Sequence, residues 1–265
     1  MKVQGKNIVV TGGGNGVGRE LVLQLLEKGA TVLAADINDA ALKDTVKKAG
    51  NSKRLFTYVV DISNREAVFA FAQKAIEEHK NIDGIINNAG IIQPFIHLNE
   101  LDMDRIDRVM NINFYGTLYM VKAFLPHLLK RPEAHIVNVS SMGGFLPVPG
   151  QSIYGASKAA VKLLTEGLSS ELQNTNVKVS VVIPGGIATD IKKNSNIAYN
   201  SSADSAKSKM ILTPTKAAEH IIKTMEKKKL RAYIGKDCNV MNVLYKVSSS
   251  FAMSMINKVM NANEH

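Results

Sequence analysis

The chain has 265 residues, of which 45% are hydrophobic and 21% are charged, enough to bury the core of one α/β domain of about 250 residues. Its 33 basic and 23 acidic residues give a formal net charge of +10, which is compatible with an acidic partner without requiring one. The single cysteine, Cys238, excludes an intrachain disulfide, and the six histidines show no metal-ligand spacing, so no metal site is expected.

The whole chain reads as one unit without targeting signals. No apolar leader precedes the first predicted strand, so neither a signal peptide nor a membrane-spanning start is expected, and a cytoplasmic location follows by default. There is no internal repeat or break in composition, which favours a single domain. The basic residues are spread out and no recognition motif is present, so nucleic acid is not an expected partner.

The N-terminal segment predicts a strand, a glycine-rich loop and a helix. Residues 7–11 are apolar and β-branched, the sequence TGGGNGVG occupies residues 11–18, and a one-sided apolar pattern runs over residues 19–28 before Gly29. Such glycines let the backbone approach a pyrophosphate, whose charge the helix N-terminus stabilises. A dinucleotide site is therefore predicted, with contacts from Gly12, Gly14, Asn15, Gly16, Val17 and Gly18.

The next predicted strand, residues 31–36, ends in an acid. The carboxylate of Asp36 can accept hydrogen bonds from adenosine ribose hydroxyls and would repel a 2′-phosphate. Neither Ile37, Asn38 nor Asn15 supplies a compensating cation. The sequence therefore favours NAD(H) over NADP(H), with Ile37 as a further contact. An alternative stays open, in which Asp36 only caps the following helix, although Asn38 could fill that role.

Apolar runs continue to alternate with helical patterns along the rest of the chain. Further strands are predicted at residues 55–60, 84–87, 135–140, 177–183 and 231–234. This alternation predicts an α/β fold, in which a doubly wound, seven-stranded parallel sheet carries helices on both faces.

A tyrosine and a lysine in the second half form a candidate proton-transfer device. Tyr154 and Lys158 lie four residues apart and share one face of a predicted helix, and Ser141 lies thirteen residues before the tyrosine. A neighbouring fixed positive charge favours the phenolate, so Lys158 is expected to lower the pKa of Tyr154 from about 10. Taken alone, the pair also fits a packed tyrosine beside a solvated lysine.

Together these motifs resemble the short-chain dehydrogenase/reductase family, from residue 6 to about residue 234. The family's motifs occur in order as T-G-x-x-x-G-x-G at residues 11–18, N-N-A-G at residues 87–90, a serine at Ser141, Y-x-x-x-K at Tyr154 and Lys158, and Pro-Gly at Pro184 and Gly185. The resemblance implies a single-domain Rossmann fold that assembles as a dimer or tetramer through helices near residues 102–130 and 154–174.

The resemblance also implies roles for individual residues. Tyr154 would act as general acid/base, Lys158 would hold the nicotinamide ribose, Ser141 would bond the substrate oxygen, and Asn113 would position a relay water. Asn87 would tie strands together. Further cofactor contacts are implied at Asp61, Ile62, Asn88, Ala89, Gly90, Pro184, Gly185, Ile187 and Thr189, although Asp61 could instead cap a helix and Thr189 could do the same.

The expected activity is NAD(H)-dependent hydride transfer between nicotinamide and a secondary alcohol or ketone. An NADPH-dependent carbonyl or 3-oxoacyl reductase is the alternative within enzymes. A non-catalytic NAD-binding regulator is the alternative from another class, and the intact set of candidate catalytic residues argues against it.

Two segments lie outside the shared core. The domain is expected to span residues 1–237, with a polar substrate lid at residues 190–212, and residues 238–265 form a helical extension. One apolar stripe of this extension contains Val240, Leu244, Val247, Phe251, Met255 and Val259, and the adjoining one contains Met241, Tyr245, Ala252, Ile256 and Met260. A single amphipathic helix is predicted. It either packs on the core or a sister subunit, or lines an apolar, lipid- or steroid-like substrate channel or touches a membrane.

Overall fold

The computed structural model describes residues 1–188, 191, 195 and 211–261. Most of the predicted lid and Thr189 lie outside these residues.

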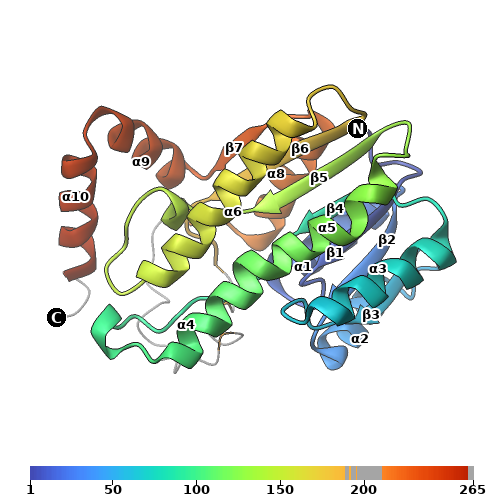
Figure 1. The fold of residues 1–265 in the computed structure, drawn as a ribbon, viewed down its shortest axis with the longest axis horizontal. Coiled ribbons are helices and arrows are strands. Elements are labelled where there is room, and N and C mark those ends of the chain that lie inside the picture. Colours follow the sequence, from blue (N-terminus) through green and yellow to red (C-terminus); the bar gives the residue numbers. More distant parts are fainter. Residues whose placement is uncertain (189–190, 192–194, 196–210, 262–265) are drawn as a thin grey trace.

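The core of the molecule is one parallel sheet (Figure 1). Its strands are β1 (Asn7–Thr11), β2 (Thr31–Asp36), β3 (Leu55–Val59), β4 (Gly84–Asn87), β5 (Ala134–Val139), β6 (Val177–Pro184) and β7 (Arg231–Ile234), in the order β3-β2-β1-β4-β5-β6-β7. All six pairings are parallel. The predicted seven-stranded sheet is confirmed, with strand ends that differ from the prediction by at most one residue.

Helices cover both faces of the sheet, as predicted. They are α1 (Gly16–Glu27), α2 (Asp39–Lys48), α3 (Arg65–His79), α4 (Met103–Met110), α5 (Gly116–Leu128), α6 (Ser152–Glu171), α8 (Pro214–Glu226), α9 (Lys236–Val247) and α10 (Ser249–Asn261). One apolar core joins α1 and α8 to the sheet through residues such as Leu25 and Ile221. The other joins α3, α5 and α6 through residues such as Phe71, Phe124 and Leu168.

The strand order creates a crevice at the carboxyl ends of β1 and β4. The chain adds β2 and β3 on one side of β1 and then returns to place β4 on the other side. The connections that leave the carboxyl ends of β1 and β4 therefore diverge to opposite faces, and ligands of doubly wound sheets bind at this point. The glycine loop after β1 and the Asn88–Gly90 segment after β4 both lie there.

The long helix predicted at residues 102–130 is interrupted. Between α4 and α5 the segment Asn111–Tyr115 forms a π-helical turn, which keeps the chain helical while shifting its side chains around the axis. Asn113 lies in this turn and is fully buried. The helix predicted at residues 154–174 is confirmed as α6, which begins two residues earlier and ends at Glu171.

The prediction of a single C-terminal helix is wrong. The backbone of Ser248 is extended, with φ −152° and ψ 102°, so the chain turns between α9 and α10. The Ser248 hydroxyl accepts a hydrogen bond from the Phe251 amide, which is how serine begins a new helix in place of continuing the old one. No helix among the described residues is long and apolar enough to cross a bilayer.

Only one of the two predicted apolar stripes is buried. Met241, Tyr245, Ala252 and Ile256 pack against Leu146 and its neighbours. Val240, Val247, Phe251 and Met255 of the other stripe are exposed, with Leu244 partly buried between them. The side chains of Val259 and Met260 are outside the described part of the chain. Figure 1 shows both helices beyond the carboxyl ends of β6 and β7.

Two helical glycines, Gly18 in α1 and Gly167 in α6, provide a test of how closely α1 is packed. A Cβ on Gly18 would overlap the carbonyl group of Gly12, whereas a Cβ on Gly167 in α6 would meet nothing within 4 Å. Gly18→Ala is expected to lower the free energy of unfolding by more than about 2 kcal/mol. The matched control Gly167→Ala should raise it by about 0.5 to 1 kcal/mol, because alanine favours a helix interior. Urea unfolding of both variants measures the difference, and equal effects would contradict the close packing.

Candidate active site

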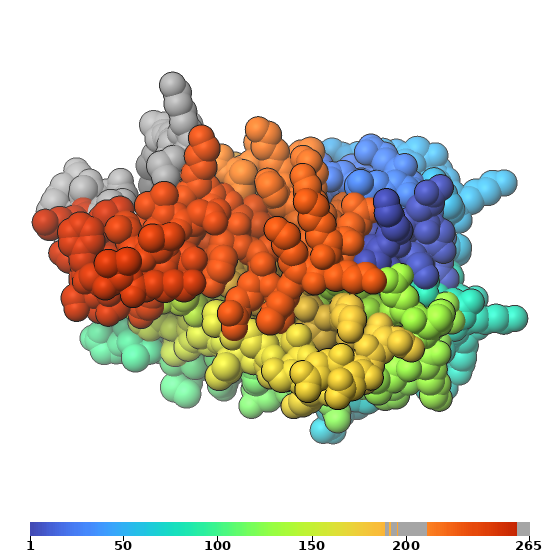
Figure 2. All heavy atoms as spheres, turned by 90° about the horizontal axis from the view of Figure 1, so that it is seen from above, coloured from blue at the N-terminus to red at the C-terminus, as the bar shows by residue number. Residues whose placement is uncertain are grey.

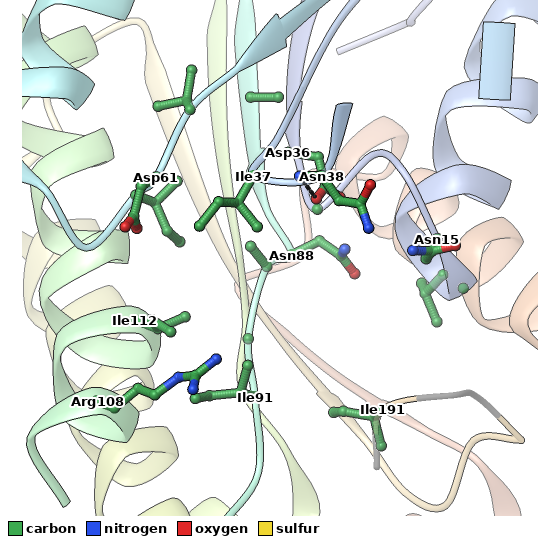
Figure 3. A pocket seen from close by; sticks show the side chains of 18 residues that line it. Asn15, Asp36, Ile37, Asn38, Asp61, Asn88, Ile91, Arg108, Ile112 and Ile191 are labelled. Atoms are coloured by element: carbon green, nitrogen blue, oxygen red, sulfur yellow. Dashed lines mark hydrogen bonds between the residues drawn. The ribbon is translucent and has the colours of Figure 1, made fainter. Parts of the chain in front are cut away.

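A cavity of about 460 Å³ opens at the carboxyl ends of β1, β2 and β4 (Figure 3). Eleven of the predicted cofactor contacts line it: Gly12, Asn15, Gly16, Val17, Asp36, Ile37, Asp61, Ile62, Asn88, Ala89 and Gly90. The other lining residues are Ala35, Asn38, Val60, Ile91, Arg108, Ile112 and Ile191. The predicted contacts at Gly14, Gly18, Tyr154, Lys158, Pro184, Gly185 and Ile187 are not among these lining residues.

The start of α1 is built to receive an anion. Asn15 is the N-cap but makes no side-chain cap hydrogen bond, so the amides of the first turn have no side-chain acceptor there. Arg19 fixes the loop from behind, because its guanidinium donates to the Gly14 carbonyl at 2.6 Å and pairs with Asp44 at 2.8 Å. The helix dipole and the first-turn amides together suit a phosphate group of a dinucleotide.

Asp36 lies at the end of β2 and organises the loop that faces it. One carboxylate oxygen accepts from the Gly14 amide at 2.9 Å and the other from the Asn38 amide at 3.0 Å. A carboxylate has about four acceptor positions, so the side chain retains capacity for ribose hydroxyls. The cap of α2 is Asn38, whose side chain accepts from the Ala41 amide. The alternative in which Asp36 only caps this helix is therefore wrong.

The Asp61 side chain stabilises its own loop and also lines the cavity. Its Oδ1 accepts hydrogen bonds from the Ser63 amide at 2.9 Å and the Ser63 hydroxyl at 2.7 Å. The N-cap of α3 is Asn64. The side chain thus closes a local turn, and it lines the cavity near Ile37 (Figure 3).

Thr11 joins the two segments that diverge at the crevice. Its hydroxyl accepts from the amides of Asn88 and Ala89, at 3.0 and 3.1 Å, and its carbonyl accepts from the Asn88 side chain. Asn87 is buried and donates to Asn138 on β5 at 2.8 Å. This contact matches the strand-tying role expected of Asn87, whereas Asn88 and Ala89 border the cavity.

Ser141, Tyr154 and Lys158 meet beside this cavity. Ser141 follows β5, the other two lie on the first turns of α6, and the Ser141 hydroxyl lies close enough to the Tyr154 phenol to favour a lower pKa for it. The neighbouring Ser140 is buried and donates to the Lys158 carbonyl, so Ser141 is the serine that faces the tyrosine. The Lys158 ammonium donates to the Val139 carbonyl at 3.1 Å.

Burial dominates the protonation of this group. Burial raises the pKa of the Tyr154 phenol, and the hydrogen bond with Ser141 opposes that rise. Lys158 is 4% exposed, and burial lowers the pKa of its ammonium to about 8. Lys158 is not among the groups that shift the pKa of Tyr154. The expected lowering of the tyrosine pKa by Lys158 is therefore not found here, because loss of hydration outweighs the other influences.

Asn113 and a residue that the sequence did not single out hold the helix that carries Tyr154. The Asn113 amide donates to Ser157 on α6 and to the Ile91 carbonyl, and its oxygen accepts from the Ile91 amide. Gln93 is 1% exposed, and its oxygen accepts from the amides of Ile153 and Tyr154 at 2.9 and 3.0 Å. Gln93 thus acts as a remote N-cap for α6.

The Pro184–Gly185 segment is held by another residue without a recognisable sequence signal. Asp237, in the first turn of α9, accepts a hydrogen bond from the Gly186 amide at 2.7 Å. A Cβ on Gly185 would overlap the same carboxylate. Ile187 pairs with Leu212 in an isolated parallel bridge. Asp237 therefore positions the turn that follows β6.

Two further features complete the surroundings. Arg108 on α4 points into the cavity near Ile91 and Ile112 (Figure 3), and it has no ion-pair partner among the described residues. No sequence motif marked it.

An apolar cluster follows Ser141. Leu146, Met241 and Ala252 are its buried members, and Met142, Phe145 and Tyr245 pack against them. The described residues contain no group of three potential ligands that could hold a metal ion.

The low pKa of Lys158 predicts a specific pH dependence of stability. Its folded value of about 8 lies below the ordinary 10.5, so the unfolded chain binds more protons between these values and folding stability rises with pH there. Relative to Lys158→Met, the wild type should gain about 3 kcal/mol between neutral pH and about pH 10.5. Urea unfolding over this range measures it. A constant difference between the two proteins would contradict the lowered pKa.

Known proteins share both this sequence pattern and this fold. The family model for short chain dehydrogenase matches residues 6–200. A putative oxidoreductase, SadH, of Mycobacterium tuberculosis is 34% identical over 255 residues, which cover 93% of this chain and 92% of that protein. The 3-oxoacyl-[acyl-carrier-protein] reductase FabG of Thermotoga maritima is 34% identical over 192 residues, covering 71% and 77%.

Solved structures agree. A short chain dehydrogenase/reductase of Burkholderia phymatum in complex with NAD has a TM-score of 0.80 and 27% identity, over 88% of this chain and 90% of the other. A short chain dehydrogenase of Burkholderia cenocepacia in complex with NADP has a TM-score of 0.82 and 28% identity, over 97% and 99%. The chain therefore belongs to the short-chain dehydrogenase/reductase family, oxidoreductases that act on CH–OH or keto groups with a nicotinamide cofactor.

Proposed function

We propose that this protein is an NAD(H)-dependent oxidoreductase that interconverts a secondary alcohol and a ketone, with Tyr154 as general acid/base. The observation that carries this proposal is the gathering of Ser141 and Tyr154 around Gly143, with Lys158 one helical turn away and against Gly90 of the cofactor cavity. A hydroxyl pair of this kind presents two hydrogen-bonding groups to one substrate oxygen.

The nicotinamide, when bound, supplies or accepts the hydride. Tyr154 gives its proton to the substrate oxygen in reduction and takes it back in oxidation, and Ser141 donates a hydrogen bond to that oxygen as charge develops. Burial raises the pKa of Tyr154, which keeps the phenol protonated and ready to donate. Lys158 and Asn113 both lie against Gly90, where they would hold the nicotinamide ribose and a relay water, respectively.

The preference for NAD(H) rests on Asp36. Its carboxylate lies at the cavity, and Ile37, Asn38 and Asn15 beside it are uncharged. Arg19, which follows the glycine loop, is already engaged by the Gly14 carbonyl and Asp44. A 2′-phosphate beside Asp36 would therefore meet a negative charge without a compensating cation at Ile37, Asn38 or Asn15.

An apolar substrate is favoured by the wall next to Ser141. Met142, Phe145 and Tyr245 form one cluster there with Leu146 and Met241. Phe145 also packs edge-on against the Tyr245 ring, with centroids 6.0 Å apart. Such a wall favours a hydrocarbon, lipid- or steroid-like group over a charged one.

A second candidate is an NADPH-dependent carbonyl or 3-oxoacyl reductase. It is favoured by the Thermotoga maritima relative, a 3-oxoacyl-[acyl-carrier-protein] reductase, and by the neighbour solved with NADP. The carboxylate of Asp36 opposes it. A non-catalytic NAD-binding regulator would have no use for the arrangement of Ser141, Tyr154 and Lys158.

We further propose a cytoplasmic homodimer or homotetramer. Support comes from apolar residues that α6 and the end of α5 leave exposed, Leu163 and Leu129. Helices of this kind associate through such faces. The expectation that nucleic acid is not a partner belongs to the same proposal.

Replacing the tyrosine tests the assigned acid/base. Tyr154→Phe should lower kcat by about 10²- to 10⁴-fold, since general acid/base catalysis contributes about that much, and should leave the Kd for NADH nearly unchanged. The control Tyr119→Phe removes a phenolic hydroxyl from α5 and should keep full activity. Steady-state rates with a series of secondary alcohols, together with NADH fluorescence titration, measure both. A Tyr154→Phe enzyme with near-normal turnover would show that another group transfers the proton.

A single added cation tests the cofactor preference. Ile37 is 66% exposed at the cavity and has Asp36 beside it. Ile37→Arg leaves both hydrogen bonds of Asp36 intact while supplying a partner for a 2′-phosphate. It should tighten NADPH about tenfold, equivalent to about 1.4 kcal/mol, and change NADH binding little. Fluorescence titrations of both cofactors measure this. A wild type that binds NADPH more tightly than NADH would overturn the proposed preference.

A further inference from the structure

The face formed by α8, β7 and the C-terminal helices carries two features that the chemistry of the active site does not use. One is a basic groove and the other is an exposed apolar stripe. Figure 2 looks onto this face, where the orange α8–β7 segment and the red α9–α10 segment lie next to each other.

The basic groove has a volume of about 330 Å³ and lies along β7, at the edge of the sheet. Lys223, Lys227 and Lys229 line it together with His220 and Arg231. Arg231 is paired with Glu166 at 2.6 Å, but none of the three lysines has an ion pair among the described residues. Unpaired like charges that share one groove repel each other, and an anionic partner would remove that cost.

The apolar stripe runs along the outer side of both C-terminal helices. Val240, Val243, Val247 and Phe251 are spaced three or four residues apart, and Val247 and Phe251 are 82% and 59% exposed. Val247 is the last residue of α9 and Phe251 lies in the first turn of α10, so these two exposed side chains flank the turn between the helices. Soluble monomers rarely expose several large apolar side chains side by side. Such a group of side chains therefore marks an interaction site.

The two features are joined by charge as well as by position. Asn239, on the first turns of α9, lines the basic groove, and Lys246 lies over the ring of Tyr233 in its wall, 5.8 Å from the centroid. From residue 236 to residue 261 the chain has three lysines and one acid, Asp237. That carboxylate is turned inward to the Gly186 amide. The outward charge beside the stripe is therefore positive.

We infer that this face docks on an anionic lipid bilayer, with Lys223, Lys227 and Lys229 on headgroup phosphates and the Val240–Phe251 stripe at the acyl boundary. Stable attachment to a membrane needs two signals, and a basic patch with an apolar insertion supplies both. A nucleic acid would satisfy the lysines but would leave the stripe in water. A second copy related by a two-fold axis through the groove would set the same lysines against each other.

Sedimentation of the full-length protein with phosphatidylcholine vesicles, with and without phosphatidylglycerol, tests this inference. The wild type should bind the vesicles that contain phosphatidylglycerol and should be released by high salt, because screening weakens the lysine contacts. Lys223→Gln/Lys227→Gln/Lys229→Gln should lower the partition coefficient at least tenfold, since each lysine contributes about fivefold. Val247→Ser/Phe251→Ser should also lower it at least about tenfold.

Two matched controls separate this surface from a general charge or apolar effect. Lys43→Gln/Lys47→Gln/Lys48→Gln makes the same charge change on α2, and Phe69→Ser removes an exposed phenylalanine from α3. Both should bind like the wild type, and all variants should keep wild-type turnover of a water-soluble alcohol.

Three results would overturn the inference. The first is a wild type that does not bind vesicles containing phosphatidylglycerol. The second is a loss of binding in the control variants that equals the loss in the test variants. The third is a protein that ignores vesicles while Val247→Ser/Phe251→Ser splits an oligomer in light scattering, because the stripe would then cover a second copy. None of these results depends on which alcohol the enzyme oxidises.

Discussion

The hydrogen bonds of Thr11 tie together the two strands on which the active site depends. β1 and β4 are neighbours in the sheet, but the chain leaves them toward opposite faces. The Thr11 hydroxyl and carbonyl accept three hydrogen bonds from Asn88 and Ala89 at that point. They keep the glycine loop and the Asn88–Gly90 segment at a constant separation. The cavity that results is bordered by the amides of α1 on one side and by Asp36 on another.

The proposed catalytic residues are held in place by residues outside their own motif. Gln93 caps α6 at Tyr154, Asn113 ties α6 to Ile91 through Ser157, and Asp237 holds the Pro-Gly turn. Each supporting residue lies far from its partner in sequence. This packing shields Tyr154 and Lys158 from water. Loss of hydration disfavours the charged form of each group, so it raises the pKa of Tyr154 and lowers that of Lys158. In the proposed reaction this keeps the Tyr154 phenol protonated for donation to a ketone oxygen.

The two sides of the C-terminal helices α9 and α10 face different environments. Its inner side, with Met241 and Tyr245, covers the segment after Ser141 and gives the site an apolar wall. Its outer side, with Val247 and Phe251, is left exposed next to lysines of the sheet edge. An enzyme that acts on apolar alcohols and rests on a bilayer would find its substrates in that same phase.

Period and spacing by themselves determined the seven strands, the parallel sheet and the residues of each motif, because these signals are local and repeat along the chain. They also led to six of the residues that line the cavity, and the family resemblance led to five more. Only the tertiary structure decided that Asn38 rather than Asp36 caps α2, that Ser248 divides the C-terminal helix, and which apolar stripe is buried. Gln93, Arg108 and Asp237 carried no sequence signal, since their roles come from contacts with distant segments. The direction of the Tyr154 pKa shift was also hidden, because hydration is lost through contacts with segments distant in sequence and not through one neighbour four residues away.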